Sequence, residues 1–146
     1  MSNKLEIILR KVGRELADYQ VARIFKVPEE MQQSPCDFFG YTVYGRAILI
    51  EAKMVDRESL PICSSPGLLP HQWGELSDAN RAGALTLICW SRGSTVAVIS
   101  MDMAIALSGG RKSIPWSAIS PEYMRPLAIT HSLQLLDHWL PLPTKA

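Results

Sequence analysis

The sequence contains few cysteines and no long apolar run. Three cysteines occur among its 146 residues, at Cys36, Cys63 and Cys89. Because their number is odd and no CxxC pair is present, neither a disulfide framework nor a zinc site is indicated. No stretch reaches the about 18 consecutive apolar residues of a membrane span, and the first residues lack the apolar core of a signal peptide. We expect no membrane association and a cytoplasmic location, in the host cell if the source is a virus.

Charge imbalance and internal repeats are also missing. The net charge is +1, with 20% charged and 47% hydrophobic residues, which is typical of a globular chain and not of a disordered one. We expect one domain over residues 1–146. The net charge neither favours nor excludes nucleic-acid binding, but the first 26 residues carry six Lys or Arg against three Asp or Glu. That end is basic.

Apolar residues recurring at three- and four-residue steps predict several helices. Pro70 suits a first helical turn, Thr130 suits an N-cap, and Gly109 and Pro141 suit helix ends. The predicted helices cover residues 2–19, 70–83, 102–107 and 130–140.

Runs rich in β-branched and aromatic residues predict five strands. They cover residues 21–27, 37–42, 46–54, 85–90 and 95–100. Turns are expected at residues 43–45 and 91–94, and loops over residues 28–36 and 55–69. The order of helices and strands predicts an α/β fold with a mixed central β-sheet flanked by helices.

An acid and a base interrupt the apolar strand that ends at Met54. Glu51 and Lys53 are two residues apart, so they share one strand face with Leu49. One interpretation is a solvated surface charge pair. The other is a buried reactive site, in which the fold tolerates the cost of desolvating two charges.

The register of the first hairpin decides which side chains meet that pair. A three-residue loop at 43–45 pairs Thr42 with Arg46 and sets Asp37 opposite Glu51, with Cβ atoms roughly 5 Å apart. Two carboxylates this close repel each other unless a cation lies between them.

A shorter turn is the alternative. A two-residue turn at Tyr44 and Gly45 would pair Val43 with Arg46 and send Asp37 to the opposite face. A bulge at Gly40 would restore the first arrangement.

In the first arrangement, the residue types suit metal-assisted phosphodiester hydrolysis. Mg²⁺ and Mn²⁺ bind through one or two carboxylates, here Asp37 and Glu51, together with waters and substrate phosphates. Lys53 on the same face could orient the attacking water or stabilise charge on phosphorus.

The residues Asp37 and Glu51-Ala52-Lys53 resemble the PD-(D/E)xK nuclease signature, with its proline displaced to Pro35. A wider set of motifs, from Leu5 to about Ile119, is similar in order to RecU-type Holliday-junction resolvases. These motifs are Lys26-Val27-Pro28, Asp37-Phe38-Phe39-Gly40, Tyr44-Gly45-Arg46, Glu51-Ala52-Lys53, Ser59-Leu60-Pro61, Pro70-His71-Gln72 and Gly109-Gly110-Arg111-Lys112-Ser113-Ile114. The resemblance implies a restriction-endonuclease-like fold, a homodimer, branched DNA such as a four-way junction as substrate, and Mg²⁺ as cofactor.

The resemblance also implies roles for single residues. Asp37 and Glu51, with the carbonyl of Ala52, would hold Mg²⁺, and Lys53 would position the water. Glu6 would assist the metal site; alternatively, it is a first-turn acid that favours the helix dipole.

Further positions carry weaker expectations. Gln72 matches a glutamine behind the site, or is simply an exposed helix residue. Basic side chains would grip DNA phosphates. The candidates are Lys4, Arg10, Arg14, Arg46, Arg111 and Lys112.

The sequence departs from the family pattern in two places. The interval from Asp37 to Glu51 is one residue longer than expected, and residues 28–36 replace a long stalk that enters the junction centre. Two rival functions therefore remain open. One is a nuclease of the same chemistry acting on flaps or single-stranded DNA, and the other is a catalytically inert DNA-binding repair module.

Overall fold

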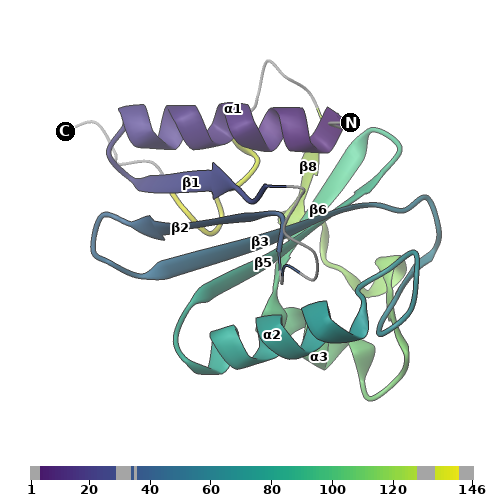
Figure 1. Ribbon diagram of the computed structural model, residues 1–146. Coiled ribbons are helices and arrows are strands. Elements are labelled where there is room, and N and C mark those ends of the chain that lie inside the picture. Colours follow the sequence, from purple (N-terminus) through teal and green to yellow (C-terminus); the bar gives the residue numbers. More distant parts are fainter. Residues whose placement is uncertain (1–3, 29–33, 35, 128–133, 142–146) are drawn as a thin grey trace.

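The computed structural model describes residues 4–28, 34, 36–127 and 134–141, and shows a twisted sheet between helices (Figure 1). The α-helices are α1 (Lys4–Asp18), α2 (Pro70–Arg81) and α3 (Met101–Ser108). The strands are β1 (Ala22–Lys26), β2 (Phe38–Thr42), β3 (Ala47–Met54), β4 (Ser59–Pro61), β5 (Leu85–Arg92), β6 (Thr95–Ser100), β7 (Ser113–Pro115) and β8 (Met124–Pro126). Short 3-10 helices cover Trp116–Ala118 and Pro121–Tyr123. No helix in the described part of the chain is long and apolar enough to cross a membrane.

The main sheet is mixed, as predicted. Its strand order is β1-β2-β3-β5-β6-β8, in which β3 and β5 are parallel and every other neighbouring pair is antiparallel. The apolar stripe of α1, including Leu5, Ile8 and Leu16, is buried against one sheet face. Helices α2 and α3 pack over β5 and β6 on the other face. The mixed α/β fold with flanking helices is confirmed.

The register of the first hairpin follows the three-residue loop. Phe38 pairs with Ile50, and the Thr42 N–H donates to the Arg46 carbonyl at 2.8 Å. Gly45 in the turn has φ +86°, a left-handed conformation that glycine adopts without strain. The alternative two-residue turn is not adopted.

Gly40 forms no bulge. It is paired in both neighbouring ladders, with Ile24 and with Ile48. A Cβ at this position would lie 1.8 Å from the Arg23 carbonyl oxygen, so only glycine permits this approach of β1 to β2. The strands pair regularly in this register, so the bulge at Gly40 that a two-residue turn would have required is not needed.

The segment over residues 55–69, predicted as a loop, contains a short strand and a bridge that the prediction lacked. Ser59–Pro61 forms β4, which pairs with β7, and Ile62 forms an isolated bridge with Leu68. Leu60 and Leu68 are fully buried. Apolar burial orders the segment although its residues follow no periodic pattern. Strands β7 and β8 also lack such a pattern, and they were not predicted.

The predicted helix over residues 130–140 is wrong in its described part. Residues 130–133 lie outside the described residues, and residues 134–140 form turns with mostly i to i+3 hydrogen bonds. Leu136 and Leu140 are buried in the core beneath α1, and the Trp139 indole donates to the Val98 carbonyl at 3.0 Å. These tertiary anchors override the local helical preference.

Candidate active site

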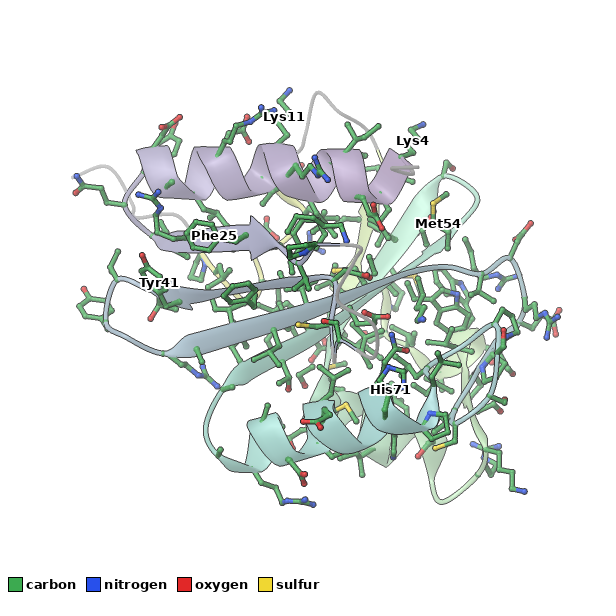
Figure 2. All side chains as sticks on the ribbon, in the orientation of Figure 1. Lys4, Lys11, Phe25, Tyr41, Met54 and His71 are labelled. Carbon is green, nitrogen blue, oxygen red and sulfur yellow. The ribbon has the colours of Figure 1, made fainter. Side chains whose placement is uncertain are left out.

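A polar cavity of about 320 Å³ opens where α1, the ends of β1 and β2, and the start of α2 meet. His71 projects from the first turn of α2 (Figure 2). The cavity is lined by Glu6, Lys26, Val27, Pro28, Ser34, Cys36, Asp37, Leu69, His71 and Gln72. Three of these, Glu6, Asp37 and Gln72, were predicted from the sequence.

Glu51 is the most buried charged residue of this region, with 1% of its surface exposed. Its Oε2 accepts a hydrogen bond from Gln72 Nε2 at 2.7 Å and lies 3.0 Å from Lys53 Nζ. Its Oε1 has no hydrogen-bond partner among the described residues. The interpretation of Glu51 and Lys53 as a solvated surface pair is therefore wrong, because Glu51 is buried and the Lys53 side chain is only 16% exposed.

Gln72 is held in a defined orientation. It occupies the first turn of α2 and is buried. Its Oε1 accepts from the Leu69 N–H at 3.0 Å, which directs the donor Nε2 toward Glu51. Gln72 is thus a buried positioning group for Glu51, not an exposed helix residue.

The hairpin register places Asp37 across from β3. Its Oδ2 accepts a hydrogen bond from the Ala52 N–H at 2.9 Å, across the hairpin from β3. Its Oδ1 lies 3.8 Å from Lys26 Nζ. Asp37 is therefore hydrogen-bonded to Ala52, which lies between Glu51 and Lys53 in β3.

The two carboxylates interact electrostatically. Burial and, after it, the charge of Asp37 raise the pKa of Glu51, and the ammonium of Lys53 opposes both effects; together they bring that pKa from 4.5 to about 8. Burial also raises the pKa of the Cys36 thiol beside them, to about 12. An uncompensated negative charge at Glu51 is therefore costly at neutral pH.

This donor set suits a divalent cation. The two carboxylates supply oxygen donors, and the unpartnered Glu51 Oε1 is the acceptor that a cation would satisfy. The Ala52 carbonyl stays a predicted third donor. The described residues include no cluster of three His, Cys, Asp or Glu side chains with metal-binding geometry. Mg²⁺ does not need one, because it commonly binds through one or two carboxylates and completes its shell with water and phosphate oxygens.

Lys26 is a site residue that the sequence reasoning missed. Its Nζ lies 4.0 Å from Glu6 Oε1 and 3.8 Å from Asp37 Oδ1, so it separates the two acids. Glu6 and Asp37 thus share Lys26 as an ion-pair partner. The pairing of Lys26 with Phe38 across β1 and β2 places it beside Asp37, and only the strand register could have revealed this. His71, which entered the prediction only within the motif Pro70-His71-Gln72, also lines the cavity.

The predicted DNA-binding residues fall into separate groups. Arg10 and Arg14 line a second cavity of about 270 Å³ together with Arg23 and Lys26, and Lys26 lines both cavities. Lys4 is exposed at the start of α1 and lies outside this lining.

The other predicted cations lie elsewhere. Arg46 sits at the turn end of β3, five residues before Glu51 or roughly 17 Å along the strand, and its Nε donates to the Gly83 carbonyl at 3.0 Å. Arg111 and Lys112 line a different cavity, beside Cys63. The structure does not bring these three cations to the acids.

A solved structure with the same fold is Hjc, a Holliday junction resolvase from the archaeal hyperthermophile Archaeoglobus fulgidus. The match has a TM-score of 0.51 and covers 75% of this chain and 85% of that chain, at 19% sequence identity. No protein-family model and no curated protein sequence gives a match. The prediction of a restriction-endonuclease-like fold is confirmed. The narrower RecU-type resemblance stays a prediction.

Proposed function

We propose that this chain is a divalent-metal-dependent DNA endonuclease that resolves four-way junctions. The observation that carries the proposal is the convergence of Asp37, Glu51 and Lys53 at the end of one hairpin, with an unpartnered carboxylate oxygen buried among them. The fold shared with the archaeal resolvase Hjc supports DNA as the substrate class.

The side chains have distinct tasks in this proposal. Asp37 and Glu51, with the carbonyl of Ala52, would hold Mg²⁺, or Mn²⁺ in its place. The chemistry that such an ion would supply is polarisation of the scissile phosphate and activation of a water nucleophile. Lys53 Nζ lies 3.0 Å from Glu51, beside the metal ligands, where an ammonium can orient that water and stabilise charge on phosphorus.

Supporting residues keep these groups in place. Gln72 holds one oxygen of Glu51 and so directs the other oxygen toward the ion. Glu6 acts on the metal site through Lys26. Arg10 and Arg14 contact the DNA backbone along the second cavity.

A junction has two symmetric strands to cut, so the proposal includes a two-fold homodimer with two such sites. The structure supports a second substrate class because β1 and β2 are joined by residues 27–37 alone, which leaves no room for a long stalk. A nuclease acting on flaps or single-stranded DNA is therefore the second candidate.

A panel of end-labelled DNA substrates tests both candidates. It contains a four-way junction, a flap, a nicked duplex, a linear duplex and a single strand of matched sequence, each incubated with Mg²⁺, Mn²⁺ or EDTA. We expect metal-dependent, symmetric cleavage of the junction. Preferential cutting of the flap or single strand would establish the second candidate.

Matched variants complete the test. Lys53→Ala should slow cutting by about 100-fold or more. Glu75 is an exposed acid on α2, and Glu75→Gln should leave the rate unchanged. If the wild type cuts no substrate with either metal and Asp37→Asn alters nothing further, the chain is an inert DNA-binding module.

A further inference from the structure

Three aromatic side chains lie exposed together on β1 and β2, and we call them the aromatic row. Phe25, Phe39 and Tyr41 are 41%, 48% and 49% exposed. Phe25 and Phe39 are directly paired across the strands, with ring centroids 6.0 Å apart, and the ring of Tyr41 lies 6.3 Å from that of Phe25. A contiguous exposed apolar patch of this kind marks a binding surface.

The described helices leave this part of the sheet uncovered. Ile24 alternates with Phe25 along β1 and lies in the core beneath α1, so the aromatic row occupies the opposite sheet face. On that face α2 and α3 pack over β5 and β6. Figure 2 labels Phe25 and Tyr41 on β1 and β2, away from α2.

Positive charge adjoins the aromatic row. The Arg23 guanidinium lies 5.8 Å above the Phe25 ring and is paired with Tyr41 across the strands. Arg23 and Phe25 also line the second cavity, whose four cations we call the basic groove. The cations of the basic groove are Arg10, Arg14, Arg23 and Lys26. No Asp or Glu lines this cavity among the described residues.

The basic groove leads to the candidate active site. Lys26 lines both the groove and the acid-containing cavity, and its Nζ is 3.8 Å from Asp37. A DNA strand whose phosphates follow the groove would pass Phe25, which belongs to both the groove and the aromatic row, and would reach the acids at Lys26.

We infer that the aromatic row and the basic groove together bind an unpaired segment of DNA, with bases stacking on the rings and phosphates along the cations. Unpaired bases expose flat faces that stack on aromatic side chains, whereas a duplex hides them. The same combination of rings and cations is the general basis of single-strand binding.

Charge complementarity favours this partner over a second copy of the chain. A two-fold interface built on the aromatic row would bring two copies of Arg23 toward each other, because its guanidinium lies over the Phe25 ring of the row. A polyanion instead neutralises the cations. The inference rests on the proposed function in taking DNA as the partner, but it does not depend on cleavage.

The test measures binding by fluorescence anisotropy in EDTA, so that no cutting takes place. The probes are a labelled oligothymidine of about 15 nucleotides and a blunt duplex of equal length. Phe39→Val with Tyr41→Val removes two rings while keeping strand-forming side chains. We expect oligothymidine affinity to fall about tenfold or more, with duplex affinity changed less than about twofold.

Two control variants separate stacking from charge. Tyr44→Ala removes a tyrosine that is 97% exposed in the hairpin turn, outside the aromatic row, and should bind both probes like the wild type. Arg14→Gln should weaken both probes alike and reduce the salt slope by about one. If the double variant fails to fold in a thermal melt, Tyr41→Val alone carries the test, with Tyr41→Phe expected to restore binding.

Two results would overturn the inference. One is unchanged oligothymidine affinity in the folded ring variants. The other is a wild type that sediments as a dimer without DNA and a double variant that sediments as a monomer, since the row would then be covered by a second copy. Intact single-strand binding without any cleavage contradicts the proposed function instead and leaves this inference standing.

Discussion

The hairpin of β2 and β3 has two ends of opposite character. At the turn end Val43 and Tyr44 are 55% and 97% exposed. Substitutions there should cost little stability, because these side chains bury little apolar surface. At the other end Phe38 and Glu51 are each 1% exposed, and Glu51 has an oxygen without a hydrogen-bond partner. The difference indicates that the buried end fixes the strand register and that the turn only has to accommodate it.

The largest effect is expected from breaking the chemistry of the buried end. Asp37→Asn and Lys53→Ala should each lower the rate of DNA cleavage by about 100-fold or more, because the proposed function assigns the metal ion to Asp37 and the stabilisation of charge on phosphorus to Lys53. Single-turnover cleavage of the best substrate in the panel measures this. Loss of rate without loss of thermal stability identifies a chemical role, and retention of full activity in both variants contradicts it.

Gly40 tests the close approach of strands that supports this end. Gly40→Ala places a Cβ 1.8 Å from the Arg23 carbonyl oxygen, so the backbone must shift. We expect the free energy of unfolding to fall by about 2 kcal/mol or more. Urea denaturation measures the change. Gly74→Ala on α2 meets no atom within 4 Å and should be neutral or stabilising, which makes it the matched control.

The pH dependence of stability sharpens the comparison further. The pKa of Glu51 is raised to about 8 in the folded chain from an ordinary value of 4.5. Its contribution to the stability of the metal-free protein is therefore fully present below pH 4.5 and is lost as pH rises through about 8. Glu51→Gln should remove this loss and raise the melting temperature at pH 9 by several degrees.

Glu75→Gln is the control for this experiment, since Glu75 is exposed on α2. Its melting temperature should follow the wild type across the pH range. Mg²⁺ should stabilise the wild type more at pH 8 than at pH 6, because the ion binds the deprotonated Glu51. A wild type whose melting temperature rises from pH 5 to pH 9 without metal would contradict the buried charge.

The smallest effect is expected at the turn. Tyr44→Asn creates an Asn-Gly pair that favours a two-residue turn, which would pair Val43 with Arg46 and shift the register by one residue. Such a shift would expose Ile48 and Ile50, which are fully buried. We therefore expect the register to hold and the cleavage rate to change less than about twofold. A loss of cleavage comparable to that of Asp37→Asn would show that the turn dictates the register.

The same contrast explains how far the sequence could be interpreted. The hairpin register was predictable only to two alternatives, because a three-residue loop places Asp37 opposite Glu51 and a two-residue turn sends it to the other face. The β4 strand and the turns over residues 134–140 were not, because they depend on tertiary burial of Leu60, Leu68 and Leu136 and not on local periodicity.

Within the site, local motifs identified the acids, Lys53 and Gln72, but not Lys26. Lys26 lies beside Asp37 only because β1 pairs with β2, and that pairing could not be derived from the sequence of either strand alone. The orientation of Gln72 likewise depends on a hydrogen bond from Leu69 at the start of α2. Basic residues were the least predictable, since Arg46 and Arg111 look equivalent to Arg10 in sequence but lie away from the acids.

The central claim is that Asp37 and Glu51 share one divalent cation, and direct metal binding tests it. Titration of the DNA-free protein with Mn²⁺, followed by the electron paramagnetic resonance signal of the free ion, measures the affinity. Either Asp37→Asn or Glu51→Gln alone should weaken binding about tenfold or more, with Glu75→Gln unchanged. Wild-type affinity in both single variants would show that no cation bridges the two acids.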